Sequence, residues 1–334
     1  MAQSFDICEH MMLGQAIADN FQASTDMALS LGKSLQKYKA FKESSVMSHY
    51  LYLYHLSKPN VGETTKLVYQ ELKATITKAP NKLTREQFKF PIEKIKNASQ
   101  SAHEQLKGLS SGCNPALRSF PLACCPWIND DTLFQIACDE AQLTHYSNTA
   151  AQVSGLTNLI CRRLIKGDEW ADAIKAAFTT VPNLLGEIQE IQHRYQNDTV
   201  LNSRVHAAYA PNTLHTALYC VTKADSFESA LKHAYELDKL FCPILVGILA
   251  GARWGNVLRL LSMLSFQQQN NMINNHNQHL LFMNTMMPSM TAQSSQQQQQ
   301  QQQQENQYDR SSINSQQCLA DKIQAVRHLW ESEN

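Results

Sequence analysis

Apolar residues along this chain recur with the period of an α-helix. Three segments carry stripes of this kind: Met27, Leu31 and Leu35; then Ala150, Val153, Thr157, Ile160 and Leu164; then Leu319, Ile323, Val326 and Trp330. Spacings of three and four residues place these side chains on one face of a helix, whereas strand-like alternation is scarce. The pattern therefore predicts an all-α fold of many packed helices.

Residues that favour helix starts stand at the edges of several predicted helices. They are Asp130 or Asp131 before a helix over about 132–143, Asp168 before a helix around Trp170, and Asp225 with Ser226 before a helix that begins at Phe227. The most apolar stretch covers residues 240–252. A membrane span needs about twenty apolar residues, so this shorter stretch predicts a buried core helix.

Residues 267–317 differ from the rest of the chain because they are rich in Gln and Asn, with nine consecutive glutamines at Gln296–Gln304. Polar tracts of this kind bury too little surface to offset their ordering entropy. We therefore expect a helical domain over 1–266, a disordered insertion over 267–317 and a C-terminal helix over 318–334 that returns to the domain. A surface loop is favoured for the insertion, with cross-β self-association as the alternative.

The charge balance of the chain is neutral, with 29 Lys and Arg against 29 Asp and Glu. A neutral chain has no global positive field that would hold nucleic acid or an anionic membrane, so we expect neither partner. The same neutrality removes repulsion between copies, which leaves self-packing at high concentration as a possible interaction.

The nine cysteines include no C-x-x-C pair, and residues 1–15 have neither the basic start nor the apolar run of a signal peptide. Both features predict reduced, mostly buried thiols in a cytoplasmic protein. The adjacent Cys124 and Cys125 stand in an apolar setting, PLACCPW, which favours inert buried thiols over redox chemistry.

Six segments, taken in chain order, resemble those of the ADP-ribosylglycohydrolase family. They are Leu13–Phe21 (LGQAIADNF), Thr25–Leu35 (TDMALSLGKSL), Gly112–Leu122 (GCNPALRSFPL), Leu143–His145 (LTH), Asn212–Tyr219 (NTLHTALY) and Gly247–Gly255 (GILAGARWG). The resemblance implies the family's all-helical fold, a multi-helix orthogonal bundle in one domain. It also implies an ancestral activity, the cleavage of an ADP-ribose linkage with two magnesium ions held by a T-D-D motif and a D-x-D-T motif.

The two metal motifs are where this sequence departs from the family. Alignment on M-A-L places T-D-D on Gln22, Ala23 and Ser24. Alignment on the closing glycine segment places the acids of D-x-D-T on Asp238 and Leu240, and its threonine on Phe241. One of four acids remains, and magnesium prefers carboxylate oxygens. We therefore expect no metal, no cofactor and no catalysis, with Leu240 and Phe241 filling the metal cavity.

A further departure lies between the first two segments, where Phe21 runs almost directly into Thr25 and the family's substrate-side loop is missing. This combination is similar to the J-crystallins of jellyfish eye lenses, an inactive branch of the family. The resemblance implies a structural lens protein. Two alternatives stay open. One is an inactive protein that binds ADP-ribose, although we do not expect such binding, and the other is a hydrolase with an altered site.

The remaining polar residues have both a structural and a functional interpretation. Asp238 is interpreted as a helix-terminal acid paired with a lysine rather than a metal ligand. His145 is expected to fix helix packing, and His215 to be a satisfied core or surface histidine. His276 and His279 have a spacing that a metal could use, but no acid or thiol flanks them.

Overall fold

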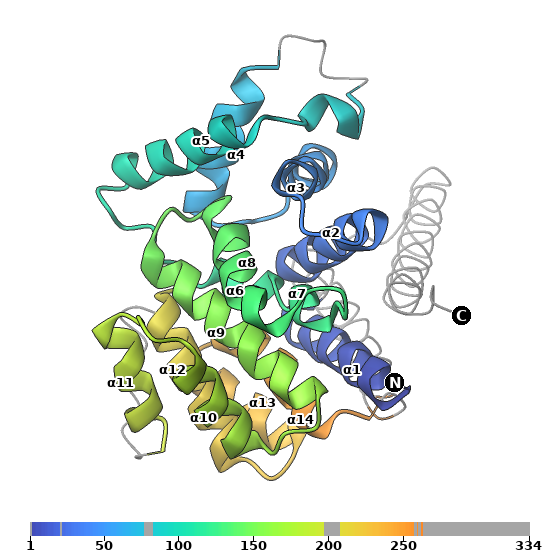
Figure 1. Cartoon of the computed structure of the whole chain (residues 1–334), viewed down its shortest axis with the longest axis vertical. Helices are drawn as coiled ribbons and strands as arrows, with labels where there is room; N and C mark the ends of the chain where they lie inside the picture. Colours follow the sequence, from blue (N-terminus) through green and yellow to red (C-terminus); the bar gives the residue numbers. More distant parts are fainter. Residues whose placement is uncertain are drawn as a thin grey trace, which may run out of the picture. The chain divides into compact units, whose positions relative to one another are not determined.

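The computed structural model describes residues 2–20, 22–76, 83–196 and 208–256, together with 259 and 262. These residues form helices, and their β-structure is an isolated bridge between Gly112 and Tyr209. The all-α prediction is confirmed (Figure 1). The elements are α1 (Ala2–Asp19), α2 (Ala23–Tyr38), α3 (Glu43–Ser57), α4 (Glu63–Ala74), the 3-10 helix η2 (Arg85–Phe88), α5 (Ile92–Gln105), α6 (Asn114–Arg118), α7 (Pro121–Cys124), α8 (Asp130–Gln142), α9 (Asn148–Ile165), α10 (Trp170–Thr180), α11 (Gly186–Arg194), α12 (Ala210–Lys223), α13 (Phe227–Leu237) and α14 (Cys242–Trp254).

The chain divides into two compact units, Met1–Val257 and Leu258–Asn334. All of the named helices belong to the first unit. The predicted insertion at 267–317 and the predicted C-terminal helix at 318–334 lie outside the described residues, as do His276 and His279. The predicted division of the chain at these positions therefore stays a prediction.

Helix α9 is the centre of the first unit. Thirteen of its eighteen residues are buried, which is more than one apolar face can account for and requires neighbours on several sides. It packs against α6, α7, α8, α10 and α12, and Figure 1 shows it crossing the middle of the molecule. The predicted stripe from Ala150 to Leu164 is buried throughout, as the spacing required.

Helices α1 and α14 are packed with their backbones in contact. A Cβ atom added to Gly247 would lie 2.3 Å from the carbonyl oxygen of Gly14, and one added to Gly251 would lie 2.4 Å from that of His10. Real Cβ contacts do not occur at such distances, so only glycine permits this approach. The glycines of the first and last resembling segments are therefore the contact surface between two helices more than two hundred residues apart in sequence.

Two helix starts differ from their predictions. Helix α8 begins at Asp130 rather than near Thr132, and the carboxylate of Asp130 forms an ion pair with Arg162 at 2.8 Å instead of capping the helix. Glu169, rather than Asp168, precedes α10. The prediction at α13 is confirmed, because the side chain of Ser226 accepts a hydrogen bond from the backbone N–H of Ser229.

Helices α2 to α5 lie at one end of the first unit, and α10 to α13 lie at the other (Figure 1). The predicted core helix is α14, which is buried from Cys242 to Gly251. Among the described residues, no helix has both the length and the apolarity needed to cross a membrane.

Candidate functional site

The first metal-motif segment lies at the start of α2. Helix α1 ends at Asp19 and α2 begins at Ala23, so a connection of only three residues stands where the resemblance implied a longer loop. Asn20 makes this tight turn with a φ of 51°, a left-handed conformation that asparagine tolerates better than most residues. Gln22 is exposed, Ala23 is partly buried and Ser24 is buried, and none of the three offers a carboxylate.

Asp19, at the end of α1, is held by the first turn of α2. Its Oδ2 accepts hydrogen bonds from the backbone N–H of Thr25 at 2.8 Å and from the Thr25 hydroxyl at 3.0 Å. Burial raises the pKa of Asp19 to about 6, opposed by these bonds and reinforced by the nearby charge of Asp26. The two acids thus interact with each other, and Asp19 ties α1 to α2.

The second metal-motif segment lies at the junction of α13 and α14, where Asp238 is buried. Its Oδ1 accepts the backbone N–H of Leu240 at 2.9 Å, and its Oδ2 accepts those of Phe241 at 3.1 Å and Cys242 at 2.8 Å. Both carboxylate oxygens therefore satisfy N–H groups at the start of α14, where the helix dipole also favours a negative charge. The interpretation of Asp238 as a helix-terminal acid is supported, but its partners are backbone amides rather than Lys239.

The expectation that Leu240 fills a cavity was wrong. The side chain of Leu240 is 67% exposed, and that of Phe241 is partly exposed. The reason is the capping turn. Because Asp238 gathers the backbone N–H groups of the next residues onto its carboxylate, the turn carries Leu240 outward.

The side chains at these positions do not fit a pair of magnesium ions. Such a site needs several carboxylates with free oxygens. Here the aligned positions supply only Asp238, whose oxygens accept hydrogen bonds from three backbone amides. Asp19, at the end of α1, has a pKa raised to about 6 and so favours its neutral form more than usual. Within the described ranges, no group of three or more His, Cys, Asp or Glu side chains is arranged to hold a metal ion.

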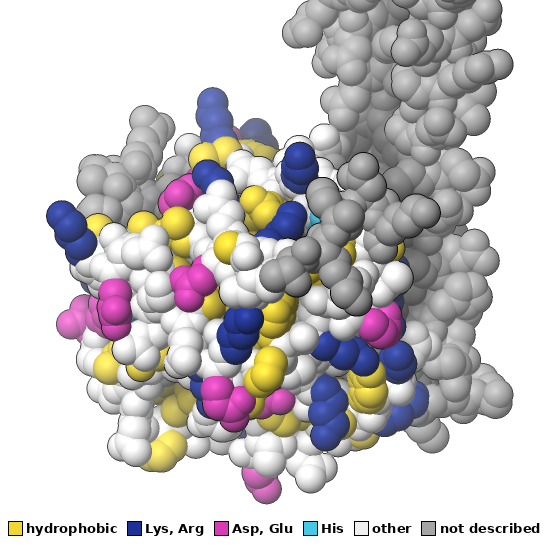
Figure 2. All heavy atoms as spheres, turned by 90° about the horizontal axis from the view of Figure 1, so that it is seen from above, with side chains coloured by type: hydrophobic (Ala, Val, Ile, Leu, Met, Phe, Trp, Pro, Cys, Tyr) yellow, Lys and Arg dark blue, Asp and Glu magenta, His cyan; other side chains and the backbone are white. Residues whose placement is uncertain are grey.

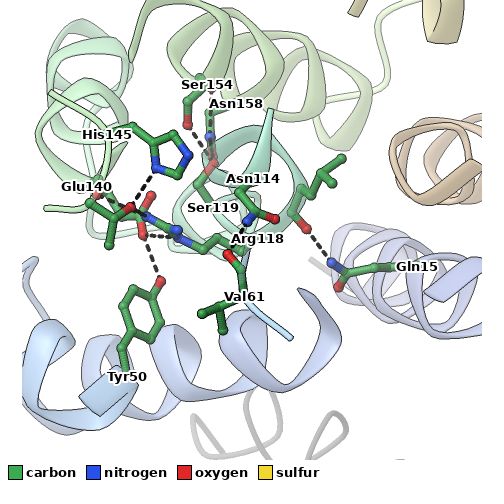
Figure 3. Close-up of polar contacts among 12 residues, drawn as sticks. Gln15, Tyr50, Val61, Asn114, Arg118, Ser119, Glu140, His145, Ser154 and Asn158 are labelled. Carbon is green, nitrogen blue, oxygen red and sulfur yellow. Dashed lines mark hydrogen bonds and ion pairs between the residues drawn. The ribbon is translucent and has the colours of Figure 1, made fainter. Parts of the chain in front are cut away.

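A separate polar cluster lies deep in the first unit, around Arg118 of the third resembling segment (Figure 3). Arg118 Nε donates to Oε1 of Glu140 at 2.8 Å, and both side chains are buried. The hydroxyl of Tyr50 donates to the same oxygen at 2.7 Å, and the guanidinium lies 5.1 Å from the Tyr50 ring centre. Helices α3, α6 and α8 are thus joined through one carboxylate.

Two atoms of this cluster lack hydrogen-bond partners among the described residues, namely Nη1 of Arg118 and Oε2 of Glu140. The guanidinium has other contacts, because its Nη2 donates to the Thr144 hydroxyl at 2.9 Å. Sequence reasoning missed Glu140 and Tyr50. The available signal for Glu140 was an acid on the same helix face as the apolar Leu133 and Ala137.

His145 has the structural role that was expected of it. Its Nδ1 lies 2.9 Å from the Thr144 hydroxyl, and its Nε2 would lie 3.1 Å from a Cβ atom on Gly112. Burial and the charge of Arg118 lower the pKa of His145 to about 3. Such a histidine is a poor proton acceptor at neutral pH. His215 is fully buried in α12, as a core histidine, and burial lowers its pKa.

The thiols are buried, as predicted. The eight described cysteines are all free and buried. Burial raises the pKa of Cys113 and of Cys138 to about 12, and it raises that of Cys124 as well. Because the thiolate is the reactive form, these thiols are poor nucleophiles.

A shallow pocket of about 220 Å³ lies between α8 and α9. It is lined by Phe134, Gln135, Cys138, Gln142, Asn148, Ala151 and Gln152. Amide groups dominate its polar lining, and its one titratable residue is a cysteine whose thiol stays protonated at neutral pH. This pocket therefore offers hydrogen bonds but no acid–base chemistry.

Comparison with known proteins agrees with the six resembling segments. The sequence profile of the ADP-ribosylglycohydrolase family matches residues 4–258. A solved structure described as an ADP-ribosylglycohydrolase-related protein complex is similar in fold, with a TM-score of 0.56 and 20% sequence identity over 76% of this chain and 89% of that one. The curated proteins contain no match. The chain therefore belongs to the ADP-ribosylglycohydrolase family.

Proposed function

We propose that this chain is a member of the family that does not hydrolyse ADP-ribose linkages and that serves as a structural protein of the J-crystallin kind. The observation that carries the proposal is the use of Asp238. Both oxygens of this acid, the one left at a metal-motif position, accept hydrogen bonds from backbone amides at the start of α14. The other acid positions hold Ala23, Ser24 and Leu240.

The chemistry of the buried groups supports a long-lived structural role. Lens proteins persist at high concentration, where thiol oxidation crosslinks neighbouring copies. Here the described cysteines are buried, and burial raises the pKa of Cys113 and of Cys138 to about 12. The Arg118–Glu140 pair is also shielded from solvent. The described thiols therefore offer oxidants little to attack.

The first experiment measures hydrolysis and ligand binding on the full chain. Arginine-linked ADP-ribose is incubated with the protein and magnesium, and free ADP-ribose is quantified. The expected result is no release above the protein-free control. A ligand that binds only the folded state raises its stability by mass action. Since we expect neither magnesium nor ADP-ribose to bind, we expect neither to shift the thermal unfolding of the protein. Magnesium-dependent release would overturn the proposal.

Two further outcomes separate the alternatives. A saturable rise in melting temperature with ADP-ribose, without turnover, would favour the inactive ADP-ribose-binding protein. The structural role itself is tested by quantitative mass spectrometry of lens tissue from the source animal. The proposal expects this chain among the most abundant soluble lens proteins, and a trace amount there would contradict the crystallin role while leaving the loss of hydrolysis intact.

A further inference from the structure

The neutral net charge hides a strong segregation of charge along the chain. Residues 33–96 hold thirteen Lys and Arg against five Asp and Glu, a surplus of eight positive charges. Residues 1–32 hold four acids and neither Lys nor Arg. The expectation that no positive field exists came from the sum over the whole chain, and a sum does not describe a local field.

Much of this surplus lies on one surface, which we call the basic face: Lys33, Lys37, Lys42, Arg85 and Lys89. The four lysines are exposed. The fold brings them together because α2 packs on α3 and α3 packs on η2. The hydroxyl of Ser44 also donates to the backbone oxygen of Phe90 at 2.7 Å, which holds the segment after Lys42 against the segment after Lys89.

Two titratable residues report the positive potential of the basic face. Burial, together with the charges of Arg85, Lys33 and Lys37, lowers the pKa of His49 to about 4, with Glu86 opposing them. The pKa of exposed Tyr38 is also lowered, with Lys37 and Lys89 acting against its desolvation. Positive charges from α2 and from around η2 thus act together on His49 and on Tyr38.

Few acids counter this charge. Glu86 forms an ion pair with Arg85 at 3.2 Å, and Glu43 stands in the first turn of α3. Within the described part of the chain, Lys33, Lys37 and Lys89 take part in no ion pair. Figure 2 views the molecule from above and shows several Lys and Arg side chains around hydrophobic ones at the lower right, with others spread over the rest of the visible face.

Aromatic rings stand beside the lysines. Lys37 Nζ lies 5.3 Å from the centre of the Tyr38 ring, which is 38% exposed. Lys39 Nζ lies 4.3 Å from the centre of the Trp127 ring. Trp127 also keeps a buried indole N–H without a hydrogen-bond partner among the described residues. Cations and accessible rings in alternation are the surface that single-stranded nucleic acids use, with phosphates on the cations and bases on the rings.

We infer that the basic face binds single-stranded nucleic acid without sequence preference, through contacts of Lys33, Lys37, Lys42, Arg85 and Lys89 with phosphates and of Tyr38 with a base. Lysine-dominated contacts suit a flexible phosphate backbone, because an ammonium acts as a point charge without the fixed fork geometry of arginine. The rings distinguish this partner from an acidic peptide or an anionic vesicle. The inference does not depend on the loss of hydrolysis.

The test measures fluorescence anisotropy of a labelled single-stranded 20-mer of mixed sequence, titrated with the full chain at several salt concentrations. Five phosphate contacts predict that log K falls with log salt at a slope of about −3.5, from roughly −0.7 per contact on a single strand. An affinity that is independent of salt, or the absence of binding at low salt, would overturn the inference.

Matched charge reversals locate the binding surface. The variant Lys37→Glu/Lys42→Glu/Lys89→Glu is expected to bind at least tenfold more weakly, with the slope reduced by about 2 because three contacts are lost. The control is Lys175→Glu/Lys232→Glu/Lys239→Glu, which changes the net charge equally at exposed lysines outside residues 33–96. Equal weakening of both variants would show a general charge effect and contradict the basic face. Circular dichroism melting confirms that both variants fold.

Two further arms identify the class of partner. Tyr38→Ala is expected to weaken single-strand binding about fivefold or more and to leave duplex binding nearly unchanged, since stacking requires an unpaired base. Polyglutamate and phosphatidylserine vesicles are added as competitors at equal charge concentration. Displacement of the oligonucleotide by either competitor as effectively as by unlabelled single strand would overturn the assignment to nucleic acid.

Discussion

The Oδ2 atom of Asp238 accepts the backbone N–H of Cys242 at 2.8 Å. This bond fixes the start of α14, the helix whose glycines contact α1. The residue at a metal-motif position thus works as a helix cap in this chain. Its retention therefore has a structural explanation that requires no metal.

Asp238→Ala is expected to lower the free energy of unfolding by about 2 kcal/mol, because removing a helix-capping side chain typically costs 0.5–2 kcal/mol and here three buried N–H groups lose their acceptor. Asp238→Asn keeps one acceptor oxygen and is expected to lose less. Urea denaturation measures both variants. If magnesium stabilised the wild type but not the alanine variant, Asp238 would be a metal ligand after all.

Gly247→Ala is expected to destabilise the protein by at least about 2 kcal/mol, since the new methyl group would lie 2.3 Å from the Gly14 carbonyl oxygen and must push two helices apart. Gly186→Ala is the matched control. A Cβ atom at Gly186 meets nothing within 4 Å, so the same change there is expected to be neutral or stabilising by about 0.5–1 kcal/mol. Similar melting temperatures for the two variants would contradict the close packing of α1 on α14.

Glu140→Gln is expected to cost about 3–5 kcal/mol, because it leaves the buried guanidinium of Arg118 without its anion. The double variant Arg118→Met/Glu140→Leu removes both charges and is expected to be less destabilised than the sum of the two single changes. Chemical denaturation of the single and double variants gives this coupling. Additive losses would show that the two side chains contribute independently.

Acid is expected to destabilise the protein through His145. Its folded pKa of about 3 lies far below its ordinary value of 6.5, so the folded state binds fewer protons than the unfolded chain between these values. Stability is therefore full above pH 6.5 and falls as the pH falls towards 3, with a slope of up to about 1.4 kcal/mol per pH unit. His49, with a pKa of about 4, acts in the same direction.

Asp19 acts in the opposite direction. Its folded pKa of about 6 exceeds its ordinary value of 3.8, so the folded state binds more protons and gains stability as the pH falls from 6 to 3.8. Thermal melts from pH 7 to pH 4 test both groups. His145→Gln is expected to flatten the loss of stability, and Asp19→Asn to steepen it. A wild-type curve that is flat over this range, with neither variant changing it, would contradict both assignments.

The helices and their buried faces could be predicted from the sequence. The stripe from Ala150 to Leu164 identified α9, and Met27, Leu31 and Leu35 identified the buried face of α2. Helical periodicity is a local property, because a side chain three or four positions away shares a face whatever the rest of the chain does. Six short segments in chain order, Gly247–Gly255 among them, likewise indicated the family.

The candidate site was predicted only in part. The absence of acids at Gln22, Ala23 and Ser24 could be read directly, because a residue type does not depend on the fold. The direction of Leu240 could not, because it follows from a turn that Asp238 makes with its own backbone neighbours. The predicted caps of α8 and α10 were wrong by one or two positions. At α8, Asp130 forms an ion pair with Arg162 on another helix, and this ion pair competes with capping.

What the sequence determined by itself was therefore which residue types the chain has and which local faces it can bury. The tertiary structure decided which of them meet. Glu140 lies 22 residues from Arg118 and 90 from Tyr50, yet both bind the same oxygen, and lysines of α2 join those around η2 on one surface. Contacts between distant segments depend on how helices pack, and packing is fixed by the shape of the whole core rather than by the spacing within any one helix.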